Sequence, residues 1–331
     1  MKKVLKILLV SALCVLSAIS MLACTPDNPT DPQTGLKYSK TKDGVYVVNG
    51  YVGTETDVVI DITEATKIRI KKDAFAGNNT IKNLTVSEKV VEIDQGAFAK
   101  MGSLEKLTVP FVGQYFNSDA TYAQSGSANQ SEKAVDKART IAHFFGTEEY
   151  DGGAWATSKY LSNGSDVSTT CYIPLTLKTI EVNATQDYAI PMDAFNGFDT
   201  PIGFEVILSS SVTAIGERAF KDSGIKNVVI PASVKTIYAN AFENSKLATV
   251  ELLATENGSI TVKDSAFKGC TKMVKFGAVD NYNVDLAKIN SDEVGENAFD
   301  FGVEEKTYQV LNATSFDSAK LRAMFGETKF N

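Results

Sequence analysis

The chain has 331 residues, 44% of them hydrophobic and 22% charged, and its formal net charge is −7. This composition excludes a disordered or collagen-like chain, and the acidic balance argues against a nucleic-acid partner. A single histidine, His143, cannot supply a metal site built from several histidines. Neither a nucleotide-binding glycine loop nor an EF-hand calcium loop is present, so we expect no cofactor and no metal.

The first predicted element is a secretory signal over residues 1–23. Three lysines precede a stretch of uncharged, mostly apolar residues that runs to position 22. A positive segment followed by a short apolar segment is typical of an export signal rather than of a membrane-spanning helix. We therefore exclude these residues from the fold.

Residues 21–24, Met-Leu-Ala-Cys, resemble the lipobox of bacterial lipoproteins, although Met and Leu are not the commonest residues at the first two positions. The resemblance implies that Cys24 carries a lipid and becomes the mature N-terminus. The alternative is an ordinary signal peptide cleaved nearby, with Cys24 an unmodified thiol. Residues 24–35 hold three prolines among polar residues and are predicted to be an extended tether. The protein would then be anchored through its lipid to the outer face of the bacterial cell envelope.

Two ends of the folded part are predicted next. Residues 36–67 are expected to form an N-terminal cap, in which the valine-rich runs on either side of Asn-Gly at 49–50 pair as a hairpin. Residues 301–331 are expected to form a C-terminal cap, with a helix that has Ser315 as its N-cap and turns Met324 inward. Such caps are needed wherever stacked repeats would otherwise expose an apolar end.

The dipeptide Ala-Phe recurs between these ends and indicates a repeat protein. It occurs seven times, and apart from one gap of 97 residues its copies are 22 to 32 residues apart, close to the period of leucine-rich-repeat solenoids. Short alternating runs with β-branched residues follow most copies, as in Leu-Thr-Val at 84–86, and predict strands. We expect the phenylalanines to stack as a buried column formed by Phe75, Phe98, Phe195, Phe220, Phe242, Phe267 and Phe299.

The repeats over 68–110 and 173–300 resemble the BspA-type, or Treponema pallidum-type, leucine-rich repeat. The segments Val-Thr-Ala-Ile-Gly-Glu-Arg-Ala-Phe at 212–220 and Asn-Val-Val-Ile-Pro at 227–231 carry the resemblance. It implies a β-rich, right-handed solenoid of about seven to eight coils with short strands and short helical corners. It also implies a structural role for Cys270, which occupies a position where the family often has cysteine.

Residues 111–172 interrupt the array and are predicted to form an enlarged coil with outward loops rather than a separate domain. The segment contains Trp155, the only tryptophan of the chain, among tyrosines, serines, glycines and asparagines. This mixture is typical of an adaptable recognition loop, although the same side chains would equally fill the enlarged coil. Apolar residues at helical spacing predict one short amphipathic helix within 130–145.

Few residues suggest catalysis. His143 lies beside two phenylalanines with no nucleophile motif around it, so we expect a structural role. A carboxylate pair for glycoside cleavage depends on a separation in space and stays open. Cys171 and Cys270 have neither disulfide nor zinc-site spacing and are predicted to be small buried side chains. We therefore expect no catalytic residue and predict that the protein is not an enzyme.

A solenoid offers a surface of stacked strands. If the residues flanking each strand centre face the core, the centres form a column that points outward. The column mixes hydroxyls, acids, apolar groups and a base, so it does not favour a polyanion. Together with Trp155 from the enlarged coil, the candidate ligand-binding residues are Thr85, Thr108, Trp155, Glu181, Glu251 and Lys275.

Two functions are compatible with these features. The family resemblance implies adhesion or protein–protein interaction, in which the solenoid face or the loops of 111–172 contact a host or neighbouring-cell surface protein. The alternative is a glycan-binding or glycan-processing envelope protein that uses Trp155 and the nearby tyrosines.

Overall fold

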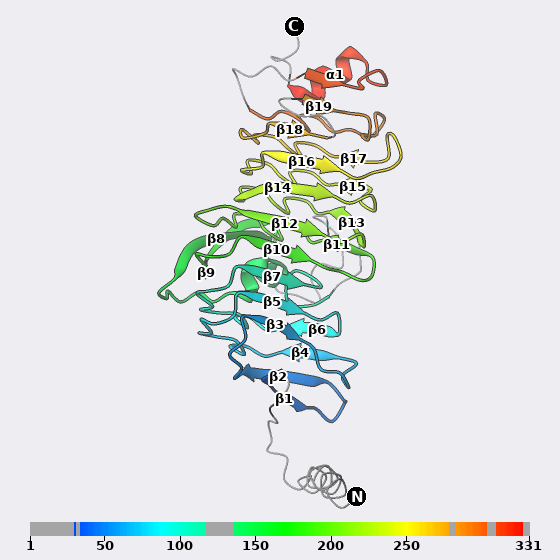
Figure 1. Ribbon diagram of the computed structural model, residues 1–331. Coiled ribbons are helices and arrows are strands. Elements are labelled where there is room, and N and C mark those ends of the chain that lie inside the picture. Colours follow the sequence, from blue (N-terminus) through cyan, green and yellow to red (C-terminus); the bar gives the residue numbers. More distant parts are fainter. Residues whose placement is uncertain are drawn as a thin grey trace, which may run out of the picture.

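The computed structural model describes residues 30, 34–116, 123, 136–277, 283–302 and 309–326. These residues form an elongated β-solenoid of about ten coils with little helix (Figure 1). The number of coils exceeds the expected seven to eight because β3 (Asp57–Ile60) and β19 (Asn283–Asp285) add strands beyond the seven coils with Ala-Phe and the enlarged coil. Cys24 and nearly all of the predicted tether lie outside the described residues.

One side of the solenoid is a parallel sheet of ten strands. Between β3 and the end of the chain, its strands are β5 (Asn83–Val86), β7 (Lys106–Val109), β10 (Thr179–Val182), β12 (Phe204–Leu208), β14 (Ile225–Ile230), β16 (Thr249–Leu252), β18 (Lys275–Phe276), β19 and β20 (Gln309–Leu311). Alternate residues such as Leu84, Leu107 and Ile180 are buried, because one face of the sheet covers the core.

The opposite side consists of two shorter sheets. Their strands are β1 (Leu36–Lys40), β2 (Tyr46–Tyr51), β4 (Ile68–Ile70) and β6 (Val90–Ile93) in one sheet, and β11 (Tyr188–Ile190), β13 (Val212–Ile215), β15 (Thr236–Ile237) and β17 (Thr261–Val262) in the other. The expected N-terminal hairpin has different strands: β2 pairs antiparallel with β1, whereas β3 pairs parallel with β5. The strand that follows Asn-Gly therefore belongs to the long sheet.

The Ala-Phe corners are turns rather than short helices. Two residues before every phenylalanine, the backbone has a positive φ, a conformation that favours Gly, Asn and Asp. These residues are Asp73, Gly96, Asp193, Arg218, Asn240, Ser265 and Asn297. In five of the seven corners the phenylalanine N–H donates to the alanine carbonyl of the next coil, at 2.6 Å from Phe220 to Ala241 and 2.7 Å from Phe242 to Ala266.

All seven phenylalanines of these corners are buried, with at most 2% exposure. From Phe195 to Phe267, successive ring centroids are 4.7 to 5.0 Å apart and the rings are parallel within 9°. Tyr51 stacks on Phe75 at one end, and Phe325 stacks on Phe299 at the other. Aromatic rings thus line the core along much of the solenoid.

The enlarged coil contains two short 3-10 helices, η3 (Asp136–Arg139) and η4 (Ile141–Phe144), in place of the one amphipathic helix expected. Part of that expected helix lies outside the described residues. Phe144 packs against Phe98 at a centroid distance of 5.7 Å, and Phe98 N–H donates to its carbonyl at 2.9 Å. The Phe144 ring therefore extends the column beyond Phe98, while its carbonyl accepts the hydrogen bond that the alanine carbonyl accepts in most other corners.

A long β-hairpin follows, where outward loops were expected. Strands β8 (Gly153–Ser162) and β9 (Ser165–Pro174) pair antiparallel over their full length and project beside β10 and β12 in Figure 1. The connecting residues, Asn163 and Gly164, both have positive φ, as a two-residue hairpin turn requires.

The C-terminal helix α1 (Ser318–Phe325) has Asp317 as its N-cap, since that side chain accepts from the N–H of Lys320 at 2.7 Å. The expectation of Ser315 at this position is wrong by two residues. Met324 is fully buried, which confirms the expectation that it faces inward. In the part of the chain that the structure describes, no helix has both the length and the apolar character needed to span a bilayer.

Candidate functional site

The hairpin β8–β9 lies across the corners of the coils and forms one wall of a pocket. Along β8, Ala154, Ala156 and Ser158 are buried, whereas Trp155 is 63% exposed. The N–H of Lys159 donates to the carbonyl of Asn196 at 2.9 Å, which joins the hairpin to the corner that follows Phe195. Alternation along one strand thus anchors one face of the hairpin and leaves the other available to a ligand.

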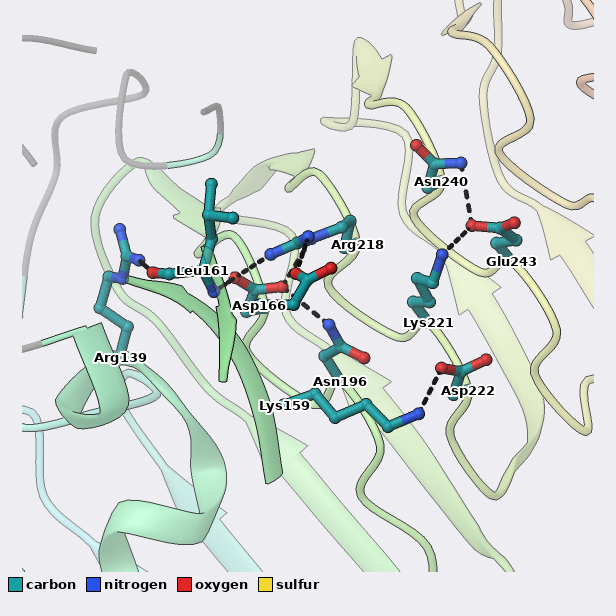
Figure 2. Close-up of polar contacts among 11 residues, drawn as sticks. Arg139, Lys159, Leu161, Asp166, Asn196, Arg218, Lys221, Asp222, Asn240 and Glu243 are labelled. Atoms are coloured by element: carbon teal, nitrogen blue, oxygen red, sulfur yellow. Dashed lines mark hydrogen bonds and ion pairs between the residues drawn. The ribbon is translucent and has the colours of Figure 1, made fainter. Parts of the chain in front are cut away.

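A buried carboxylate fastens the far end of the hairpin. Asp193 is fully buried, and its Oδ2 accepts from the N–H of Leu161 at 2.9 Å. Arg218 donates to both oxygens of Asp193 at 2.9 Å. It also donates to Oδ1 of Asp166 at 2.7 Å (Figure 2). Asp166 belongs to β9, so this clamp joins both strands of the hairpin to two successive corners.

The clamp holds Arg218 in its charged form. Burial lowers the pKa of the guanidinium, but the hydrogen bonds and charges of Asp193 and Asp166 outweigh it, so the pKa lies above the ordinary value. The φ of Arg218 is 54°, a region that costs a non-glycine residue about 1–3 kcal/mol. Its bidentate pairing with Asp193 compensates for this strain.

The pocket has a volume of about 360 Å³. It lies between β8 and the turns after Phe195 and Phe220, and its lining residues are Trp155, Ala156, Thr157, Lys159, Gly197, Asp199, Thr200, Pro201 and Asp222. At Gly197, which has a φ of 72°, an added Cβ would lie 3.1 Å from the Lys159 side chain and the Thr157 carbonyl. The pocket wall therefore needs glycine there.

Each acidic side chain of the pocket has a lysine partner. Lys159 Nζ donates to Asp222 Oδ2 at 2.7 Å, a contact visible in Figure 2, and Lys246 Nζ donates to Asp199 Oδ2 at 2.6 Å. Asp199 Oδ1 and Thr200 Oγ1 are buried and make no hydrogen bond within the described structure. Buried polar atoms usually have hydrogen-bond partners, so two unpaired oxygens in one pocket wall are unusual.

The candidate residues of the long sheet do not all fall in one column. Strand pairing places Thr85 beside Thr108 and Thr108 beside Glu181. Lys275, however, pairs with Thr249, so it lies in the neighbouring outward row, and the expectation that it shares a column with Glu251 is wrong. The pairing register of β18 is the reason. A shift of two residues along a strand leaves a side chain on the same face of the sheet but moves it into the neighbouring column of side chains.

Thr108 is only 6% exposed and is not available as surface. Its hydroxyl donates to Glu181 Oε2 at 3.3 Å, and Lys106 Nζ lies 2.7 Å from the same oxygen. Thr85 and Glu181 are half-buried, and Glu251 is exposed. The face between the two acids is apolar, because Ile207 pairs with Glu181, Val229 pairs with Glu251, and these two are 46% and 42% exposed.

His143 and Cys171 line a small cavity of about 60 Å³ that is separate from the pocket. Burial raises the pKa of the Cys171 thiol to about 12, whereas a nucleophilic cysteine needs a lowered pKa. Nε2 of His143 lies 3.1 Å from the carbonyl of Ile93. The geometry therefore favours the structural role expected for His143.

Cys270 occupies a repeated position, three residues after its phenylalanine, which Ser223 and Ser245 occupy in earlier coils. Its thiol donates to the carbonyl of Phe242 at 3.1 Å and contacts Ser245 Oγ at 3.5 Å. Among the residues that the structure describes, no cluster of three or more His, Cys, Asp or Glu side chains is arranged to hold a metal.

Only Trp155 of the pocket residues was singled out from the sequence. Asp199, Thr200 and Asp222 carry no motif, and they meet β8 because three separate coils bring them together. A local signal for the hairpin does exist: Asn163-Gly164 is the dipeptide most typical of a tight hairpin turn, and β-branched and polar residues surround it.

The chain belongs to the BspA-type leucine-rich repeat family. The family model matches six repeat copies over residues 57–128 and 188–301, more than half of the chain. Proteins with leucine-rich repeats generally bind other proteins, and solenoids of this family are generally not enzymes. A search of curated proteins gave no match.

Several crystal structures are similar at low identity. A leucine-rich repeat protein of Treponema pallidum is 17% identical, with 90% of this chain and 96% of that chain covered and a TM-score of 0.36. A leucine-rich cell surface protein of Faecalibacterium prausnitzii is 14% identical, with 91% and 98% covered and a TM-score of 0.29. A leucine-rich repeat protein of Eubacterium ventriosum is 13% identical, with 82% and 94% covered and a TM-score of 0.28.

Proposed function

We propose that the protein is a lipid-anchored binding protein of the bacterial cell surface, and that the outer face of its ten-stranded sheet engages a protein of the host or of a neighbouring cell. The observation that carries the proposal is the exposed pair Ile207 and Val229, which lies between Glu181 and Glu251 in the strand register. An apolar centre with charged residues at its edge is the usual anatomy of a protein interface.

The dimensions of the face support a protein partner. Ten strands at a spacing of about 4.8 Å extend over roughly 43 Å, which is comparable with the width of a standard protein interface. Lysine–acid pairs such as Lys178–Glu105 and Lys82–Glu105 occupy the part nearer the N-terminus. Charged pairs at the edge of an interface favour specificity and fast association more than affinity.

A binding experiment tests this proposal. The soluble chain that begins at Thr25 is applied to immobilised extracellular-matrix proteins, and Val229→Asp is compared with Val91→Asp, which places the same charge at an exposed valine on the opposite side of the solenoid. We expect Val229→Asp to weaken binding by about tenfold or more, as a lost apolar hot spot does, and Val91→Asp to leave it unchanged. Equal binding by the two variants, or no binding to any matrix protein, would contradict the proposal.

The anchor is tested separately on the full-length chain. Cys24→Ser removes the sulfur that would carry the lipid, so the protein is expected to leave the membrane fraction of the producing cells. The matched control is Cys270→Ser, which changes a buried thiol far from the N-terminus. Unchanged partitioning of the Cys24→Ser protein would refute lipidation.

A second candidate function is glycan binding or glycan processing at the cell envelope. One observation favours it, namely that Trp155 exposes 63% of its surface at the mouth of the pocket. A pulldown with matrix proteins and a glycan array, run with the same soluble chain, distinguish the two functions. If Trp155→Ala abolishes glycan binding and matrix proteins never bind, the adhesion proposal fails.

A further inference from the structure

We propose that the pocket beside the hairpin β8–β9 binds one neutral saccharide unit, which stacks on Trp155 and places its hydroxyl groups against Asp199 and Thr200. The inference rests on the glycan alternative above and names its site and ligand class. It is independent of protein binding by the long sheet, because no residue of the pocket belongs to that sheet.

The first argument concerns the aromatic wall. Trp155 is held in a ten-residue strand opposite Tyr172, and the far end of that hairpin is fixed by Asp193 and Arg218. A large aromatic side chain on a rigid element loses little conformational entropy when it binds a ligand. The negative face of an indole ring attracts the weakly positive C–H groups on one side of a pyranose. An exposed tryptophan on a fixed hairpin therefore provides a rigid surface on which a sugar ring can stack.

The second argument concerns the two buried oxygens. Thr200 is 1% exposed, and neither its Oγ1 nor Asp199 Oδ1 has a hydrogen-bond partner within the described structure. Gly224 lets the carboxylate lie close, since a Cβ at that position would be 1.7 Å from Asp199 Oδ1. Leaving a buried acceptor unpaired costs about 1–3 kcal/mol. A ligand hydroxyl that donates to these oxygens, after a small side-chain rotation, would recover part of that free energy.

The third argument concerns charge. Lys159 neutralises Asp222, and Lys246 neutralises Asp199, so the charged side chains of the pocket wall are paired. A uronic acid or another anionic sugar would meet two carboxylates and would have to compete for lysines that already have partners. A neutral sugar keeps both ion pairs and adds hydrogen bonds to them. The pocket therefore favours a neutral saccharide over a charged one.

The fourth argument concerns size. A volume of about 360 Å³ is at the small end of the range for ligand sites, which runs from about 300 to 1,000 Å³. This space suits a single pyranose ring, either a monosaccharide or the terminal unit of a longer glycan. The lining provides one aromatic face and several hydroxyl or carboxylate groups, which matches the two kinds of surface that a sugar ring presents.

The single tryptophan makes the test direct, because all indole fluorescence of the chain comes from Trp155. The soluble chain from Thr25 is titrated with neutral oligosaccharides and with uronate-containing oligosaccharides of the same length, by fluorescence and by calorimetry. We expect saturable binding of at least one neutral glycan, and binding of the uronates weaker by about tenfold or more.

Variants test the assigned residues. Thr200→Val keeps the shape of the side chain and removes its hydroxyl, so we expect about tenfold weaker binding of the neutral glycan. Asp199→Asn replaces one acceptor by an amide and is expected to act in the same direction. Thr185→Val, an exposed threonine outside the pocket, serves as the matched control and should bind like the unchanged chain. Calorimetry is used for Trp155→Phe and Trp155→Ala, of which the first should retain part of the affinity.

Several outcomes would overturn the inference. These are no binding of any neutral glycan, equal or tighter binding of the uronates, or full affinity in the Thr200→Val protein. Failure of this proposal is distinguishable from failure of the protein-binding proposal. Val229→Asp should leave glycan binding unchanged, and Thr200→Val should leave binding to matrix proteins unchanged.

Discussion

The regular coils from β11 to β18 and the enlarged coil between β7 and β10 fill the same core by different means. In the regular coils, each phenylalanine stacks on the next at 4.7 to 5.0 Å, so each repeat is stabilised by its nearest neighbours. In the enlarged coil, Phe144 continues the column, but the hairpin depends on a buried ion pair between Asp193 and Arg218. Repetition supports the first region, and one polar contact network supports the second.

The long sheet is unaffected by this difference. Lys106 to Val109 pair with Thr179 to Val182 in continuous register, although these paired residues are about three times as far apart in the sequence as those of an ordinary coil. A solenoid can therefore accept a large insertion at one corner, because the adjoining strands still find their neighbours. The pocket is built on that insertion, where extra side chains do not disturb the stack.

The largest expected effect comes from removing a ring of the column. Phe220→Ala in a regular coil should lower the free energy of unfolding by about 3–5 kcal/mol, because it leaves a cavity among fully buried rings. Phe144→Ala should cost a similar amount if the enlarged coil uses the same column. Urea denaturation followed by circular dichroism measures both. A loss below about 1 kcal/mol for either variant would show that its ring is not part of a packed core.

The clamp should have the next largest effect. Asp193→Ala leaves Arg218 partly buried without its main partner and removes the acceptor of the Leu161 N–H, so we expect a loss of about 3 kcal/mol. Cleavage by a protease should then become faster within the hairpin β8–β9 and remain slow in the regular coils. Asp187→Ala, at an exposed position, is the control. Unchanged protection of the hairpin would show that the clamp does not hold it.

The two cysteines allow the same substitution to be compared in the enlarged coil and in the regular coils. Cys171 Sγ lies 3.7 Å from the carbonyl oxygen of Ala156. Cys171→Ser puts a hydroxyl on a shorter bond, too far from that acceptor for a hydrogen bond, and should cost about 1–3 kcal/mol. Cys270→Ser introduces the residue that the array already uses at Ser223 and Ser245, and should change stability by less than about 1 kcal/mol. Thermal unfolding of the two variants compares these values. A larger loss for Cys270→Ser than for Cys171→Ser would contradict the repeat assignment.

The smallest effect is a dependence on pH. Burial raises the pKa of both thiols to about 12, whereas an unfolded thiol has a pKa of about 8.5. Below about pH 8.5 both states keep their protons, and above it the unfolded chain loses them first, so stability falls as the pH rises. In the soluble chain from Thr25, both thiols should be unreactive toward a thiol reagent near pH 8 until the protein unfolds. Rapid reaction in the folded state would show that the burial is incomplete.

The features that could be predicted from the sequence are those with a local pattern. Leu84 to Val86, Leu107 to Val109 and Val228 to Ile230 alternate within a few residues, and each forms the expected strand of the long sheet. The register of Lys275 could not be predicted in this way, because pairing with Thr249 depends on the length of the preceding corner. The N-cap of α1 was misplaced because Ser315 and Asp317 are both good capping residues.

The sequence by itself determined the repeat family, the phenylalanine column and the strands, because a period of 22 to 32 residues repeats the same local interactions. Only the tertiary structure decided where the hairpin lies and which side chains surround Trp155. Asp199, Thr200 and Asp222 approach β8 through packing between coils, and that packing has no counterpart in the order of residues along the chain. The scaffold is thus a property of periodic sequence, whereas the candidate site is a property of the one place where the period is broken.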